Sequence, residues 1–193
     1  MVKNETVTVD TEGTRPSRTW NSRELLIIGA FGALGAVVTA TASPATAAVA
    51  LVSPVAYALV AGIHFVLPFT AGIMLQSWRA IPLTALFTAA LAFPFSTLGL
   101  LLFPALGLPT LAAGLAVKMT GCRWQSPARW AIVAAVGAVV IFAISLVAIR
   151  PDLFSTALLV SVLAARLVST GLAVVIAHLI VASLARAGVR VRR

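Results

Sequence analysis

The chain has 193 residues, of which 61% are hydrophobic and only 10% are charged, and its formal net charge at pH 7 is +9. Soluble domains carry about 25% charged residues, so this chain has too few charged side chains to cover a surface in water. The basic residues lie singly or in small groups between apolar runs, which is typical of membrane topology signals and not of a nucleic-acid groove. Composition therefore predicts an all-α integral membrane protein that does not bind nucleic acid.

Charged residues and helix breakers divide the chain into a six-helix transmembrane bundle with a polar segment at each end. Residues 1–19 are polar and are expected to form a disordered cytosolic tail. A six-span membrane domain is expected over residues 20–188, followed by a basic cytosolic tail at 189–193. The runs of apolar residues, each about long enough to cross a membrane, predict spans at residues 25–43, 55–77, 80–98, 100–118, 130–149 and 155–185.

The first predicted span carries a stripe of small side chains, which we call the small-residue stripe. Its members recur at steps of three and four residues and so share one helix face: Gly29, Gly32, Ala33, Ala36 and Ala40. Small residues let another helix approach closely, so the stripe fits both docking of a second protein and packing within the bundle. The following segment, 41–54, is apolar and contains two prolines, which favour an outer loop lying against the bundle. A half-span is the alternative.

The second predicted span places Tyr57 and His64 seven residues apart and therefore on one face. Pro68 follows His64 by four residues, removes the backbone hydrogen bond to the His64 carbonyl, and is expected to kink the helix there. One interpretation is a polar, kinked wall of a binding cavity. The other is a histidine that is hydrogen-bonded to a neighbouring helix.

Arg166 lies about 16 Å along the sixth predicted span, close to the middle of the membrane. A charge at that depth costs about 3 kcal/mol or more on insertion scales and usually faces a cavity or a partner. No predicted span contains an acidic residue, so the guanidinium is available for a carboxylate, a phosphate or a polar ring of a substrate. The alternative is an arginine that reaches helix carbonyls. The predicted substrate-binding residues are Arg166, Ser169, Thr170, His64 and Tyr57.

The positions of the basic residues predict the orientation of the bundle. With six spans, all but two of the 14 lysines and arginines fall on the side that holds both termini. The exceptions are Arg150, beside Asp152 in an outer loop, and Arg166 within a span. Basic residues are enriched in cytosolic loops, so both termini are expected in the cytosol. We expect a multi-pass protein of the cell membrane, with membrane lipid around it.

The residue inventory argues against catalysis. The acidic residues lie outside the predicted spans, only His64 and His178 are available as histidines, and neither a G-x-S-x-G motif nor a glycine-rich phosphate loop occurs. We therefore predict no catalytic residues, no metal and no cofactor. The same lack of acids disfavours a proton-coupled carrier, because such proteins usually have a titratable relay within the membrane.

Together these features resemble the substrate-binding S components of energy-coupling factor (ECF) transporters, over roughly residues 20–188. The resemblance rests on chain length, six spans with both ends inside, the entry WNSRELL at 20–26 and the segment GAFGALGA at 29–36. It implies a non-enzymatic subunit that captures a vitamin-like small molecule from outside, under a lid formed by residues 41–54. It also implies that the small-residue stripe contacts a transmembrane coupling subunit, which works with two ATPase subunits.

The resemblance does not extend to a named substrate. The glycine-tyrosine signature of the biotin subfamily is not present, and no other subfamily motif assigns a ligand. Two other functions stay open at this point. One is a stand-alone secondary transporter or exporter, for which an internal repeat and broken helices are expected. The other is a non-transport scaffold subunit in which Arg166 binds lipid or a partner.

Overall fold

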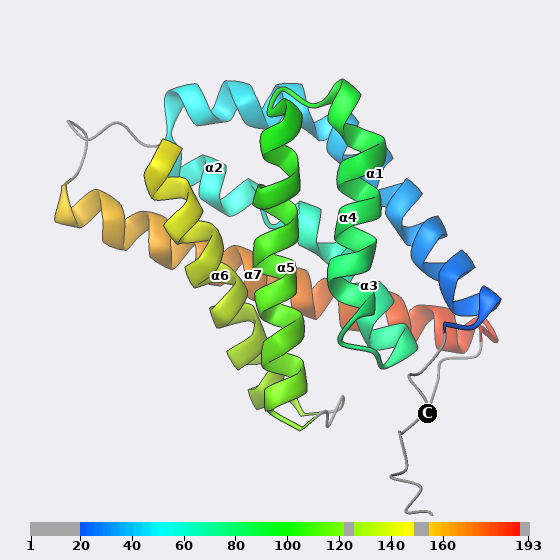
Figure 1. Ribbon diagram of the computed structural model, residues 1–193. Coiled ribbons are helices and arrows are strands. Elements are labelled where there is room, and N and C mark those ends of the chain that lie inside the picture. The colour runs from blue at the N-terminus through cyan, green and yellow to red at the C-terminus, as the bar shows by residue number, and fades with distance from the viewer. Residues whose placement is uncertain (1–19, 122–125, 149–154, 190–193) are drawn as a thin grey trace, which may run out of the picture.

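The computed structural model describes residues 20–121, 126–148 and 155–189 as a bundle of α-helices (Figure 1). The predicted tail at 1–19, all but the first residue of the predicted tail at 189–193, and Arg150 and Asp152 of the predicted outer loop lie outside the described residues. In chain order the helices are α1 (Ser22–Val52), α2 (Pro54–Val60), α3 (Ile63–Leu75), α4 (Ala80–Ala92), α5 (Leu102–Met119), α6 (Pro127–Ala148) and α7 (Thr156–Arg186). Two short 3₁₀ turns, η1 (Phe93–Phe95) and η2 (Gly99–Leu101), join α4 to α5.

The six predicted spans are confirmed as six apolar helical stretches. Five are long and apolar enough to cross a membrane, and the sixth is a shorter apolar stretch at Ala80–Phe95. Large apolar side chains such as Leu26, Val160 and Leu179 are exposed on the outer surface. Such side chains are favourable against lipid, where apolar groups need no cover. The chain is therefore a multi-pass membrane protein. The long stretches are Ser22–Val52, Pro54–Leu75, Gly99–Met119, Pro127–Leu146 and Thr156–Arg186.

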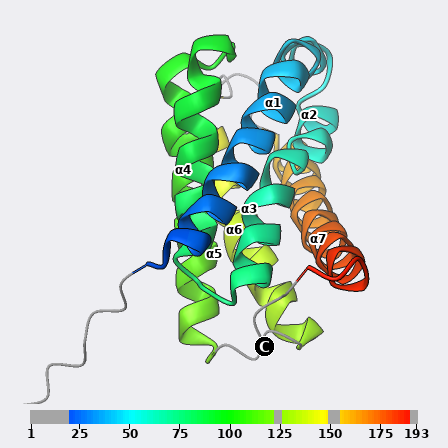
Figure 2. The same cartoon turned by 90° about the vertical axis from the view of Figure 1, so that its right-hand side faces the viewer.

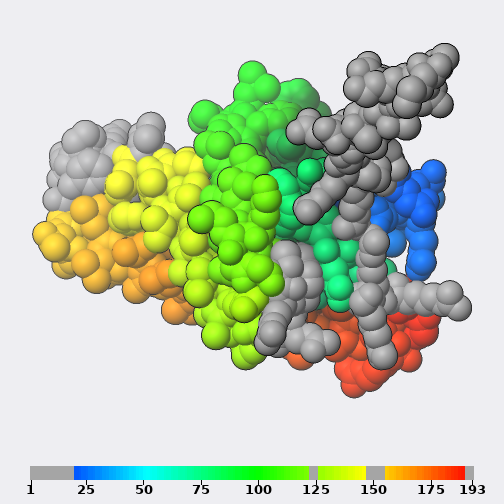
Figure 3. All heavy atoms as spheres, turned by 60° about the horizontal axis from the view of Figure 1, so that its bottom comes forward, coloured from blue at the N-terminus to red at the C-terminus, as the bar shows by residue number. Residues whose placement is uncertain are grey.

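Close contacts between small and hydroxyl-bearing side chains join the helices. α1 packs against α4 and α3 (Figure 2), while α5 lies between α4 and α6 (Figure 1). A Cβ atom at Gly35 would lie 2.4 Å from the Thr88 hydroxyl oxygen, so only glycine permits this approach of α1 to α4. The Thr88 hydroxyl also donates a hydrogen bond of 3.2 Å to the Gly32 carbonyl. In the space-filling view, α5 and α6 form a continuous surface beside α7 (Figure 3).

The predicted end of the first span near residue 43 is wrong, because α1 continues to Val52. Residues 41–52 are thus helical, and neither a loop nor a separate half-span follows the first span. Figure 1 shows the C-terminal part of α1 turning across one end of the bundle. Pro44 removes only one backbone donor, whereas an open loop beside lipid would leave many backbone groups unpaired. Ser53 follows the last residue of α1 and caps the start of α2, because its hydroxyl accepts a hydrogen bond of 3.2 Å from the Ala56 N–H.

The second predicted span is divided into α2 and α3 by a break at Ala61 and Gly62. The break therefore lies before His64, and Pro68 is accommodated inside α3. Ser169 of α7 holds the break: its hydroxyl accepts a 2.9 Å hydrogen bond from the Gly62 N–H and donates one to the Leu59 carbonyl. A Cβ atom at Gly62 would lie 2.1 Å from the Ser169 hydroxyl oxygen. Glycine is required here because α7 approaches the backbone itself.

We expect Ser169→Ala to destabilise the bundle more than the removal of a hydroxyl group from an exposed serine does. The substitution leaves a backbone N–H and a backbone carbonyl without their partner in a buried contact, at a cost of about 1–3 kcal/mol. Thermal unfolding of the purified protein in lipid nanodiscs, followed by circular dichroism, measures the change. The matched control is Ser161→Ala, because the exposed Ser161 hydroxyl bonds only the Ala157 carbonyl of its own helix. Equal melting temperatures for the two variants would contradict the role given to Ser169.

Candidate functional site

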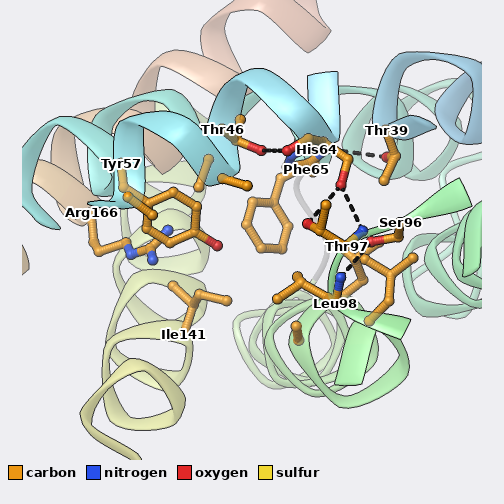
Figure 4. A pocket seen from close by; sticks show the side chains of 17 residues that line it. Thr39, Thr46, Tyr57, His64, Phe65, Ser96, Thr97, Leu98, Ile141 and Arg166 are labelled. Atoms are coloured by element: carbon orange, nitrogen blue, oxygen red, sulfur yellow. Dashed lines mark hydrogen bonds between the residues drawn. The ribbon is translucent and has the colours of Figure 1, made fainter. Parts of the chain in front are cut away.

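A cavity of about 310 Å³ lies inside the bundle, between the C-terminal half of α1 and the helices opposite it. This volume is near the lower limit of small-molecule sites, about 300–1,000 Å³. Phe65, Leu106 and Ile141 are among the apolar side chains of its wall. Its polar lining comes from five parts of the chain (Figure 4) and consists of Thr39, Ser43, Thr46, Tyr57, His64, Ser96, Thr97 and Arg166.

Arg166 reaches this cavity from α7 and is only 3% exposed. Its Nη2 donates a hydrogen bond of 3.1 Å to the Ser145 hydroxyl on α6. Its Cζ lies 5.1 Å from the centre of the Tyr57 ring on α2, a cation–π contact. Nε is buried without a partner among the described residues. Glu24, in the first turn of α1, is the one acidic residue in the described part of the chain. The guanidinium is thus fixed in position between α6 and α2, with a neutral hydroxyl and a ring as its partners there.

A second polar group lies across the cavity from Arg166 and Tyr57 (Figure 4). The Thr39 hydroxyl lies 3.1 Å from His64 Nδ1 and joins α1 to α3. The Ser43 hydroxyl lies 3.1 Å from the Thr97 hydroxyl and also accepts a hydrogen bond of 3.1 Å from the Thr97 N–H. These bonds fasten the second half of α1 to α3 and to the connection between η1 and η2.

The structure brings together three of the five predicted substrate-binding residues. Arg166, Tyr57 and His64 all line the cavity, whereas Ser169 and Thr170 do not. Ser169 is engaged at the break between α2 and α3, and the Thr170 hydroxyl donates a 2.7 Å hydrogen bond to the Arg166 carbonyl. The other histidine, His178, lies away from the cavity and bonds the Val174 carbonyl of its own helix at 2.9 Å.

Sequence reasoning missed the polar wall that α1 contributes. Thr39, Ser43 and Thr46 recur at steps of four and three and therefore share one helix face, and all three are buried. This periodicity was the available signal, but treating residues 41–54 as a loop concealed it. Ser145 was also missed, because a single serine in an apolar span gives no sign of which helix it faces.

The packing of α1 against the bundle buries some members of the small-residue stripe and leaves others exposed. Gly32 and Ala36 are buried within the bundle, Gly29 and Ala40 are half-buried, and Ala33 is exposed. A Cβ atom at Gly32 would lie 2.7 Å from the Phe87 Cβ, whereas one at Gly29 would meet nothing within 4 Å. Packing on α4 thus accounts for Gly32, and Ala33 faces outward from the protein.

The described residues contain no group of three or more histidine, cysteine or acidic side chains that is suited to a metal ion. Neither a protein-family model nor a curated protein matches this sequence. Among solved structures, the crystal structure of an S-component of an ECF transporter is similar, with a TM-score of 0.80 and 22% sequence identity. The similarity covers 89% of this chain and 88% of that one. This chain therefore has the fold of an ECF transporter S component, as its sequence predicted.

Proposed function

We propose that this protein is the substrate-capture subunit of an ECF-type ABC importer. It binds a vitamin-like small molecule from outside and delivers it with a transmembrane coupling subunit and ATPase subunits. The observation that carries the proposal is the cavity, because it lies inside an S-component fold and holds the buried Arg166. A protein with this role catalyses no reaction. It needs a substrate-binding site and a surface on which the coupling subunit docks, and the ATPase subunits hydrolyse the ATP.

The cavity residues have distinct parts in this proposal. Arg166 and Tyr57 form one contact with the substrate, since the Tyr57 hydroxyl points into the cavity (Figure 4). His64 forms another, because Thr39 engages Nδ1 and no described residue bonds the opposite ring nitrogen. Apolar lining with a few convergent polar groups is the usual composition of a small-molecule site.

The charge distribution supports an orientation with this cavity toward the outside. The described basic residues other than Arg166 occupy the end of the bundle away from the cavity: Arg23, Arg79, Lys118, Arg129 and Arg186. Two of them, Arg79 and Lys118, each lie 5.3 Å from the centre of the Trp78 ring, as expected at a membrane interface. By the positive-inside rule this end faces the cytosol.

Transport by the reconstituted complex tests the function. The full chain in proteoliposomes should bind substrate alone but accumulate it only with the coupling subunit, the ATPases and ATP on the cytosolic side. Radiolabelled water-soluble vitamins, supplied as a pool to the outside, are the probes. Gradient-driven accumulation by the chain alone would instead identify a secondary transporter. Failure of the chain to bind any vitamin or to join the complex would overturn the proposal.

Ala33→Leu should block assembly with the coupling subunit and leave substrate binding unchanged. Ala33 is exposed on α1, and a larger side chain there separates two closely packed membrane helices. We expect the amount of co-purified coupling subunit to fall about tenfold, which corresponds to about 1.4 kcal/mol.

The matched control for this variant is Ala143→Leu, since Ala143 is also exposed but belongs to α6. Gly35 is unsuitable as a control, because it packs directly on Thr88. Normal recovery of the coupling subunit with Ala33→Leu would remove this face of α1 from the docking surface.

A further inference from the structure

The two ends of the cavity differ in chemistry, and this difference restricts the substrate. We infer that the substrate is a small monocarboxylate with an apolar body and a hydrogen-bonding group at the end opposite its carboxylate. The carboxylate meets Arg166, the body lies along the apolar wall, and the far group meets the hydroxyls of α1. This inference rests on the proposed function and assigns the chemical class of its substrate.

The Arg166 end is built for an anion. The guanidinium is buried, and the described protein supplies it with a hydroxyl and an aromatic ring instead of a carboxylate. Nε has no partner at all among the described residues. A buried charge is costly until an opposite charge approaches it. A carboxylate entering the cavity supplies that charge, and arginine binds this group with two parallel hydrogen bonds.

The substrate carries a single negative charge because the cavity offers a single cation. Arg166 is the one lysine or arginine in the cavity lining. A phosphate monoester carries about −1.5 to −2 at pH 7, so much of its second charge would stay unneutralised in an apolar surrounding. A cationic molecule is excluded more strongly, since the lining contains no acidic side chain to receive it and Arg166 would repel it.

The far end of the cavity is neutral and rich in hydroxyl groups. Ser43, Thr46 and Thr97 lie there together with the pair formed by Thr39 and His64. The Thr46 hydroxyl donates to the Ser43 carbonyl at 3.0 Å, which leaves its lone pairs free to accept. A hydroxyl group has one donor and two acceptor positions, so these residues retain capacity for a ligand. A hydroxyl, amide or ring N–H of the substrate fits this end.

The wall between the two ends is apolar. Phe65 lies between Arg166 and Thr97 in Figure 4, and Ile141 lies below Tyr57. A polar body would lose its water hydrogen bonds against these side chains without replacement. An apolar or cyclic body instead gains burial and contacts the Phe65 ring. The cavity of about 310 Å³ admits only a compact body of this kind.

The experiment uses the full chain, immobilised in nanodiscs, and the small molecules of yeast extract as the probe. Retained molecules are eluted and identified by mass spectrometry. The inference expects a retained monocarboxylate with an apolar body, which binds about 100-fold more weakly to Arg166→Gln than to the unaltered protein. Its primary amide, prepared chemically, should bind the unaltered protein about 100-fold more weakly as well. Arg186→Gln is the matched control, since it removes an exposed charge from the same helix.

The outcomes separate the substrate class from the function. Retention of a neutral, cationic or phosphorylated molecule, or equal binding of the acid and its amide, overturns the class and leaves substrate capture intact. Retention of no molecule overturns both proposals. Because Arg166→Gln also loses its contacts to Ser145 and Tyr57, its melting temperature is measured beside its affinity. The comparison of the acid with its amide uses only the unaltered protein, so it tests the substrate class even when Arg166→Gln unfolds.

Discussion

The contact between α7 and the break that separates α2 from α3 organises the site. Ser169 bonds the backbone within that break at Gly62 and just before it at Leu59. Tyr57 precedes the break and His64 follows it, yet both side chains line one cavity. Arg166, three residues before Ser169 on the same face of α7, then stacks on the Tyr57 ring. A single helix face thus fixes the backbone with a hydroxyl group and supplies the cavity with a charge.

This arrangement follows from the solvent around the bundle. In lipid, a broken helix exposes backbone groups that water does not satisfy, so a break needs a partner from a neighbouring helix. Ser169 is that partner, and Gly62 permits it to come close enough. Arg166 presents the opposite case, because its neighbours satisfy only part of its hydrogen-bonding capacity. Ser169 supplies partners to two backbone groups at the break, whereas the buried cation of Arg166 keeps Nε without a partner among the described residues. An incompletely satisfied charge of this kind is typical of a functional residue in a membrane.

Residue patterns predicted which helices form better than they predicted how these helices contact one another. The six apolar stretches follow from runs of apolar residues, which have to be helical in lipid. The prediction that Tyr57 and His64 share one face of a continuous helix was wrong, because they lie on α2 and α3, although both line the cavity with Arg166. The end of α1 was misplaced because Pro44 was given the breaking effect that it has in water, while α1 continues to Val52. The partnerships of Ser145 and Ser169 were out of reach, because they depend on how each helix is rotated against its neighbours, and one sequence does not contain that rotation.

The extension of α1 also changes how the cavity relates to the surface of the protein. Thr39, Ser43 and Thr46 place one face of α1 in the cavity wall, and Ala33 lies on an exposed face of the same helix. Hydrogen bonds between Thr39 and His64 and between Ser43 and Thr97 hold the second half of α1 against the bundle. Under the proposed function, a molecule that fills the cavity touches the same helix that carries Ala33, the residue proposed to meet the coupling subunit. Any difference in the affinity of that neighbour between the empty and the filled protein has to arise from a difference in free energy between states of α1. On that proposal, a substrate would act on this difference at the hydroxyl contacts of α1, because these contacts connect α1 to the cavity.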